Sequence, residues 1–403
     1  MTEFNMNRIL QISFVGIATL AATQVSAVSP YINKVYEFCP APGQFVNEIP
    51  EYEPGDDYAA MLAKAQEQLA GSARGGMVSL GAFGGYVTFG FDHRILNKPG
   101  EYDFKVNGNA IVSDRDNMGG SCEPGIILVS IDANGNGEPD DEWYEIKGSE
   151  YDNPTTFRGY EITYYRPADN HAATPDPDDS HIVDVKYIRW TSNDSSNPQG
   201  YIQRNDNHDQ SYWPMWLDST VDKLSFVGSR LAPNAYTLPG DTPYWVLGML
   251  GEGYADNMPT VENHGLVDPG VNIEWAVKSD GTPANLEGID FVRVYTAMNQ
   301  TCGQLGETST EVVGAEDLHP EYSSVDVIRT DSPVVVALKS AEGVISLRSG
   351  YDEAVNCMLV SVSGSVVKHF TLAPGDNTIE IPGIVKGIYI VALPDGRAVK
   401  IAI

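Results

Sequence analysis

The sequence is poor in features that would place it in several well-known classes. Its 403 residues include only 25 Lys and Arg against 55 Asp and Glu, for a formal net charge of -30. This charge disfavours nucleic acids and anionic membrane surfaces as partners, because both would repel the chain. The 4 cysteines, at positions 39, 122, 302 and 357, match no zinc-binding spacing.

Long hydrophobic runs are also scarce. After residue 27 no apolar run approaches the roughly 18 residues that a membrane-spanning helix needs. At the N-terminus, Arg8 precedes the apolar run from Ile9 to Leu20, and residues 25–27 (VSA) suit a signal peptidase. We therefore expect a signal peptide at residues 1–27, export to the cell surface or the extracellular space, and no transmembrane span in the mature chain. A short transmembrane anchor is the alternative.

An exported chain permits disulfides, and four cysteines allow three pairings. Among these we favour Cys39 with Cys302, because that bridge would join the two ends of the first domain.

Catalytic motifs are missing as well. No G-x-S-x-G occurs, which disfavours a serine hydrolase. The glycine-rich segment Gly81–His93 has neither a G-K-[ST] nor a following helix, so it is no phosphate loop. An extracellular polysaccharide hydrolase or lyase remains an alternative, because carboxylates are abundant and such enzymes need two of them about 5 to 10 Å apart. The candidates for that pair are Glu123, Asp141, Glu142 and Glu145.

What the chain does contain predicts an all-β fold. Its 39 Gly, 25 Pro and 21 Tyr accompany many short alternating segments and few helical patterns. We expect a large jelly-roll-like β-sandwich with one short helix at residues 28–318, a linker at 319–324, and a small Ig-like β-sandwich at 325–403. The helix is predicted at Tyr58–Leu69, where Asp56 or Asp57 can cap it and Met61, Leu62, Ala65 and Leu69 form one apolar face.

The stretch from Glu123 to Glu150 holds the densest set of oxygen-bearing side chains. A β-branched run at Ile126–Ile131 and the segment Trp143–Ile146 predict two strands, joined by a loop of Asp, Asn and Gly. Oxygen ligands at alternate positions suit Ca²⁺, which collects about six to eight of them. The spacing follows the start of an EF-hand loop but ends at Trp143, so we expect a hairpin-borne Ca²⁺ site. Its predicted ligands are Asp132, Asn134, Asn136, Glu138, Asp140 and Asp141.

A polar hairpin turn with no ion is the alternative for this loop. A second cation site is a weaker expectation and would involve residues beside later strands. These residues are Asp256, Asn257, Glu274 and Asp290.

Aromatic residues gather in two places and predict a ligand platform. Rings interleaved with carboxylates can stack on sugars or other planar ligands. The predicted ligand-binding residues are Tyr212, Trp213, Trp216, Tyr244 and Trp245, with Trp213 or Trp216 expected to face solvent. The alternative is that these rings fill the core of the sandwich.

Two resemblances extend this interpretation. The last 80 or so residues resemble the C-terminal sorting domain of type IX secretion in Bacteroidota, through LVSVSG, the strand GIYIV and the basic terminal strand with Lys400. Residues 35–318 resemble cell-surface proteins of gut Bacteroidota, which can accompany nutrient-uptake genes, including those for vitamin B12. The matching segments are PAPGQFVN, FGGYVTFGFDH, DFKVNGNA, EPGIILVSIDANGNGEPDDEWYE, GYADN and GETSTEV. The second resemblance implies a surface location and carries over no catalytic residue.

Together these features predict an exported, calcium-stabilised and non-enzymatic surface protein that binds a glycan or another small nutrient. Its expected partners are that ligand and the export machinery. Besides the hydrolase or lyase, the alternatives are a structural or adhesive surface module and an accessory protein of vitamin B12 (corrinoid) uptake.

Overall fold

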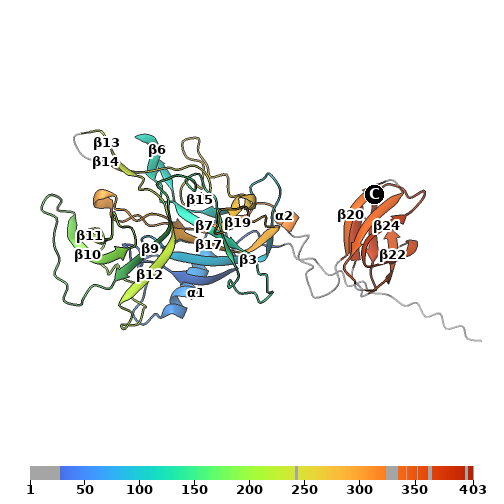
Figure 1. Ribbon diagram of the computed structural model, residues 1–403, viewed down its shortest axis with the longest axis horizontal. Coiled ribbons are helices and arrows are strands. Elements are labelled where there is room, and N and C mark those ends of the chain that lie inside the picture. The colour runs from blue at the N-terminus through green and yellow to red at the C-terminus, as the bar shows by residue number, and fades with distance from the viewer. Residues whose placement is uncertain are drawn as a thin grey trace, which may run out of the picture.

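The computed structural model describes residues 28–240, 244–323, 335–341, 343–351, 353–361, 365–394 and 398–402 (Figure 1). The predicted signal peptide and residues 324–334, where the linker and the last domain were expected to meet, lie outside these ranges. The chain is nearly all β, which confirms the predicted fold class. In the described ranges no helix is both long and apolar enough to cross a membrane.

A seven-stranded antiparallel sheet forms the centre of residues 28–323. Its order is β1-β3-β17-β7-β8-β16, and β15 adds to β7 outside this path. The strands are β1 (Lys34–Cys39), β3 (Tyr86–Leu96), β7 (Gly125–Ser130), β8 (Trp143–Ile146), β15 (Tyr254–Ala255), β16 (Ala276–Val277) and β17 (Gly288–Thr296).

Smaller sheets surround this central sheet. One four-stranded sheet has the order β11-β10-β9-β12, from β9 (Phe157–Tyr165), β10 (Ile182–Ser192), β11 (Gln199–Asn205) and β12 (Lys223–Arg230). A second has the order β13-β14-β6-β5, from β5 (Ile111–Ser113), β6 (Asp116–Ser121), β13 (Ala235–Leu238) and β14 (Tyr244–Gly248). Two short pairs complete this part: β2 (Val78–Ser79) with β18 (Glu311–Val312), and β4 (Phe104–Asn107) with β19 (Gly314–Asp317).

The central sheet is buried on both faces. Successive side chains of a strand point to opposite faces, so one strand contributes to two cores. On β7, Ile126 packs with Tyr160, Tyr164 and Trp190 of the β11-β10-β9-β12 sheet, which makes a sandwich. The next residue, Ile127, packs in the core on the other face, together with helix α1 (Tyr58–Leu69).

Helix α1 has the predicted bounds. The side chain of Asp57 accepts a hydrogen bond of 2.9 Å from Ala60 N, which satisfies one of the free N–H groups of the first turn. Met61, Ala65 and Leu69 are buried at helical spacing and belong to the same core as side chains of the central sheet. Figure 1 shows helix α1 beside this sheet. The remaining helical segments are short: η1 (Ile273–Trp275), η2 (Gly303–Leu305) and α2 (Pro320–Ser323).

Two sequence predictions about this part were wrong. The sequence YDFKVNGNAIV, Tyr102–Val112, predicts one strand, but the structure has two, β4 and β5, with a break at Gly108. A Cβ atom at Gly108 would lie 2.3 Å from Asp256 Oδ1, so this position accepts only glycine. The predicted Cys39–Cys302 disulfide is not formed, because all four cysteines are free thiols. Burial raises the pKa of the Cys302 thiol to about 12.

Residues 335–402 form two further sheets with their own core. These are β20-β21-β24 and β23-β22-β25-β26, and in the described residues their strands pair only with one another. The strands are β20 (Val335–Ala341), β21 (Val344–Ser349), β22 (Val355–Ser361), β23 (Val366–Leu372), β24 (Gly375–Glu380), β25 (Ile388–Ala392) and β26 (Ala398–Ala402). Ile345, Leu347, Leu359 and Val391 are buried between the sheets.

Candidate functional site

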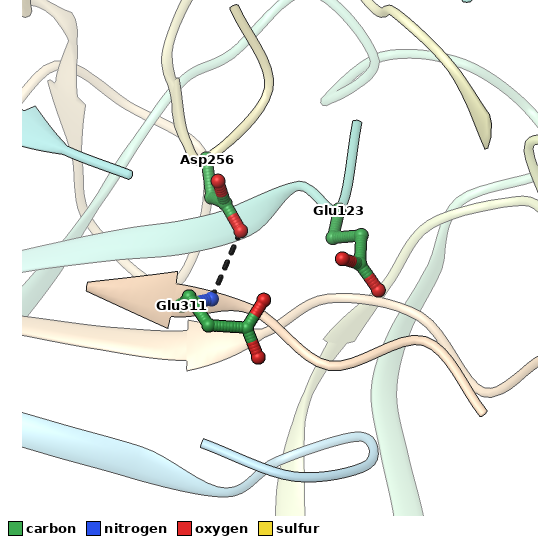
Figure 2. Close-up of side chains that lie close together, drawn as sticks. All are labelled: Glu123, Asp256 and Glu311. Atoms are coloured by element: carbon green, nitrogen blue, oxygen red, sulfur yellow. Dashed lines mark hydrogen bonds between the residues drawn. The ribbon is translucent and has the colours of Figure 1, made fainter. Parts of the chain in front are cut away.

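Three carboxylates meet beside the central sheet. Glu123 precedes β7, Asp256 follows β15, and Glu311 begins β18. One carboxylate oxygen from each lies within 4.8 Å of the others, and no other such group of His, Cys, Asp and Glu occurs in the described residues. Figure 2 shows the three side chains approaching from separate segments. We call Glu123, Asp256 and Glu311 the carboxylate cluster.

Strand pairing explains how the cluster forms. Ala255 of β15 pairs with Gly125 of β7, and Glu123 N donates a hydrogen bond of 2.9 Å to Asp256 O. Glu311 N donates to Asp256 Oδ2 at 2.9 Å (Figure 2). Strand pairing and these hydrogen bonds therefore bring together residues that lie 55 or more positions apart in the sequence.

Asp256 is the most tightly held of the three. Its Oδ1 accepts hydrogen bonds of 2.8 Å from both Asn109 N and Ala110 N, in addition to the bond from Glu311 N. Its φ of 52° lies in the left-handed region, which non-glycine residues rarely occupy. These three N–H donors favour the charged form of the carboxylate, and so they oppose the effect of its burial on the pKa.

The other two carboxylates both accept hydrogen bonds from Ser309. Ser309 N donates to Glu123 Oε1 at 3.0 Å, and Ser309 Oγ donates to Glu311 Oε1 at 2.8 Å. Ser309 Oγ also lies 2.6 Å from Ser79 Oγ. The hydroxyl groups orient the carboxylates but bring no positive charge.

Electrostatically the cluster lacks a counter-charge. Asp256 is 1% exposed and Glu311 3%, and no Lys, Arg or His of the described ranges forms an ion pair with the cluster. Burial raises the pKa of Glu311 to about 7. Burial, followed by the charges of Glu311 and Asp256, raises the pKa of Glu123 well above its ordinary value. Burial, followed by the charge of Glu311, also raises the pKa of Asp256 well above its ordinary value.

Chemically, such a cluster must be neutralised either by protons or by a bound cation. The donor atoms are hard oxygens, which suit Ca²⁺ or Mg²⁺. The amide Oδ1 of neighbouring Asn109 is buried, has no hydrogen-bond partner in the described part of the chain, and offers a further oxygen. The residues that could hold a cation here are Glu123, Asp256, Glu311 and Asn109.

Sequence reasoning found this cluster only in pieces. Glu123 was a candidate acid or base, Asp256 belonged to a weaker cation site, and Glu311 was not singled out. The other members of that weaker site have partners elsewhere: Asn257 bonds Leu250 and Gly251, Glu274 accepts from Gly100 N, and Asp290 pairs with Arg94. The predicted grouping of Asp256, Asn257, Glu274 and Asp290 was therefore wrong. The only sequence signal for Glu311 was the polar run TSTEV (308–312) in which it lies.

The acidic loop of residues 132–141 joins β7 to β8, as predicted. Asp132 accepts from Asn136 N at 3.1 Å and from Gly137 N at 2.9 Å. The amides of Asn134 and Asn136 each donate to Asp140 at 3.0 Å. These four predicted ligands thus lie in one hydrogen-bonded network.

The other two predicted ligands point to different partners. Glu138 lies 3.5 Å from Lys34 Nζ, and Asp141 accepts from Ala133 N at 3.0 Å. The loop is fixed to the central sheet, because Asp132 N donates to Asp290 Oδ2 at 2.8 Å and Asp290 pairs with Arg94.

If the acidic loop binds Ca²⁺, removing the ion with EDTA is expected to lower the melting temperature of the chain by several degrees. The reason is that an ion bound only by the folded state stabilises that state. The measurement is a thermal melt with 5 mM Ca²⁺ or EDTA, for the wild type and for Asp140→Asn. Asp140→Asn should lose most of the difference, whereas Asp178→Asn, in an exposed loop, should keep it. If Asp140→Asn kept the full difference in melting temperature between Ca²⁺ and EDTA, the ion would have to bind elsewhere. If the wild type showed no difference, the chain would bind no stabilising Ca²⁺.

The aromatic residues separate into a buried and a surface group. Tyr212, Trp213 and Trp216 are 0%, 2% and 7% exposed, so the expectation that Trp213 or Trp216 faces solvent was wrong. Their loop is held inward by Asn47, which donates to Ser211 O and Trp213 O and accepts from Met215 N.

Tyr244 and Trp245 remain at the surface. They line a hollow of about 290 Å³ in which Tyr244 is 37%, Ile111 57% and Leu305 49% exposed. The guanidinium of Arg115 lies 4.3 Å from the centre of the Tyr244 ring and orients it. We call this site, lined by Ile111, Tyr244, Trp245 and Leu305, the aromatic hollow. It brings two of the five predicted ligand residues together.

Comparison with known proteins adds no name to this site, because neither a protein-family model nor a curated protein sequence matches the chain.

Proposed function

We propose that this chain is an exported, calcium-stabilised and non-enzymatic binding protein for a glycan or another small nutrient. The observation that carries the proposal is the aromatic hollow. Its volume of about 290 Å³ is at the lower end of small-ligand sites, and its exposed side chains are largely apolar. A sugar ring presents C–H faces that pack on aromatic rings and hydroxyls that bond polar groups at the edge.

The arrangement of the carboxylates favours binding over hydrolysis. A glycosidase needs two carboxylates on either side of a substrate cleft. None of Glu123, Asp256 and Glu311 lines the aromatic hollow or either of two other surface hollows. The remaining candidates have structural partners, since Glu142 accepts from Tyr144 Oη at 2.9 Å and Glu145 from Ser229 Oγ at 2.7 Å.

Calcium has a structural role in this proposal. The acidic loop and the carboxylate cluster flank β7, and a divalent cation at either place would offset negative charge that this acidic chain concentrates there. Extracellular fluids supply Ca²⁺, which agrees with the proposed export. In this proposal the chain is a cell-surface protein of the kind found in gut Bacteroidota, and its last domain is a type IX sorting domain, as the two resemblances suggest.

Tyr244→Ala is expected to weaken binding at least tenfold, because it removes the most exposed ring of the aromatic hollow. The first step is a thermal-shift screen of the purified chain against glycans and corrinoids. The best ligand is then titrated by calorimetry into the wild type and Tyr244→Ala.

Tyr201→Ala is the matched control, because Tyr201 is 41% exposed on β11 and lines no described hollow. Equal losses in both variants, or none in Tyr244→Ala, would contradict binding at the aromatic hollow. A screen without any ligand would favour the structural or adhesive alternative.

A further inference from the structure

A second hollow, of about 310 Å³, lies where β9 and β11 end and β10 begins. It shares no lining residue with the aromatic hollow. Arginine, histidine and apolar side chains line it together, which is unusual for a chain with such an excess of acidic residues. The lining residues that matter here are Arg166, His171, Tyr187, Arg204, Trp213 and Met215.

The two arginines keep their positive charge available. Neither Arg166 nor Arg204 has a carboxylate within ion-pair distance in the described ranges, unlike Arg94, Arg230 and Arg293. Arg204 donates from Nε to His208 O at 3.4 Å and from Nη2 to Asp209 O. Arg166 makes one long side-chain hydrogen bond, 3.4 Å to Asp218 O. These contacts are to carbonyl groups, so they position the guanidinium groups and do not neutralise them.

The buried carboxylate of this hollow is already engaged. Asp184 is 2% exposed, its Oδ2 lies 2.5 Å from His171 Nε2, and its Oδ1 accepts from Thr174 N and Lys186 N. Asp169, an exposed loop residue, is the other acidic group in the lining. Of the two carboxylates in the lining, Asp184 is thus held by groups other than the arginines. Neither guanidinium has a carboxylate within ion-pair distance in the described ranges, so both can bind an added carboxylate.

The rest of the lining suits a ring with apolar faces. Met215 is 47% exposed, and Tyr187 packs edge-on against Tyr212 at a centroid distance of 5.3 Å. Among the residues that the structure describes, the buried Nε1 of Trp213 has no hydrogen-bond acceptor. An unpaired buried N–H is costly, and such groups are usually satisfied by a partner, a water or a ligand.

We propose that this hollow binds an acidic sugar, with the carboxylate held by Arg166 and Arg204 and the ring against Tyr187 and Met215. Arginine suits this task because its planar group can bind a carboxylate through two parallel hydrogen bonds. The volume matches one or two sugar rings. The site goes beyond the proposed function, since it neither uses the aromatic hollow nor requires a ligand there.

The test compares methyl β-glucuronide with methyl β-glucoside, which differ only in the carboxylate at C6. Binding to the full chain is measured by ligand-observed NMR titration. The glucuronide is expected to bind at least tenfold more tightly than the glucoside. Arg166→Gln and Arg204→Gln should each weaken glucuronide binding about tenfold or more. Arg189→Gln should leave it unchanged, because Arg189 is an exposed residue of the same sheet that rests on Tyr165 outside the hollow.

Thermal melts separate loss of binding from loss of folding. Should Arg204→Gln unfold, Arg166→Gln decides, because its single long hydrogen bond contributes little to the fold. Equal binding of glucuronide and glucoside would overturn the proposal, and so would full binding by folded Arg166→Gln. Competition by inorganic sulfate as strong as that by glucuronide would reduce the site to a general anion site and would also overturn it.

Discussion

Replacing Trp216 by alanine is expected to lower the free energy of unfolding by about 3 to 5 kcal/mol, the usual cost of deleting a buried tryptophan. Trp216 is 7% exposed and stacks on Phe38 of β1 with ring centroids 6.1 Å apart. It belongs to the core on the helix side of the central sheet. Urea denaturation followed by circular dichroism measures the change.

Met215→Ala is the matched control for stability, because Met215 is the neighbouring residue and is 47% exposed. Its free energy of unfolding should stay within about 0.5 kcal/mol of the wild type, as for most surface substitutions. If Trp216→Ala were as stable as the wild type but bound a ligand less well, Trp216 would be a ligand residue after all. The buried placement would then be wrong.

Without divalent cations, the chain is expected to lose stability as the pH rises from about 5 to about 8. Burial raises the pKa of Glu307 to about 8 and that of Glu311 to about 7. A carboxyl group with a raised folded-state pKa binds its proton more tightly when folded than when unfolded. The stabilisation that the protonated carboxyl group gives the folded state is therefore fully present below the unfolded-state pKa. It is lost as the pH rises through the folded-state pKa.

Glu307 should account for a large part of this effect. It is 4% exposed, and its Oε1 accepts a hydrogen bond from Gln44 N. Its Oε2 is buried and has no hydrogen-bond partner within the described ranges. Each unit of pKa shift corresponds to about 1.4 kcal/mol, so the loss between the two pH values should be on the order of several kcal/mol. Glu307→Gln, which cannot ionise, should show a smaller loss over the same range.

Urea denaturation at pH 5 and pH 8 in EDTA measures this dependence. Glu67→Gln, at an exposed position of α1, should keep the dependence of the wild type. Repeating the series with Ca²⁺ tests the carboxylate cluster, because a bound cation would stabilise the ionised cluster and reduce the loss. Constant stability from pH 5 to pH 8 in EDTA would contradict the buried placement of these carboxylates.

Several elements were predictable because their signals are local. Asp57 and the spacing of Met61, Ala65 and Leu69 specify a capped amphipathic helix within a dozen residues. The apolar run of β7, the Asn and Gly turn and the aromatic start of β8 specify a hairpin in the same way.

The candidate sites were less predictable, because burial depends on segments far away in the sequence. A Trp–Pro–Met–Trp loop has the same composition whether it faces solvent or the core. Asn47, more than 160 residues earlier, holds it inward. Tyr244 has the same type of side chain as Tyr212, yet it is exposed because β14 belongs to a smaller outer sheet.

The sequence by itself determined an acidic, nearly all-β chain with one amphipathic helix and an oxygen-rich hairpin, since composition and short-range periodicity carry that information. Only the tertiary structure decided that Glu123, Asp256 and Glu311 converge on one site beside the central sheet, and which aromatic and arginine side chains remain at the surface. Those outcomes depend on strand pairing between distant segments. No local pattern records that pairing, because each strand sequence is compatible with many partners until the whole core is packed.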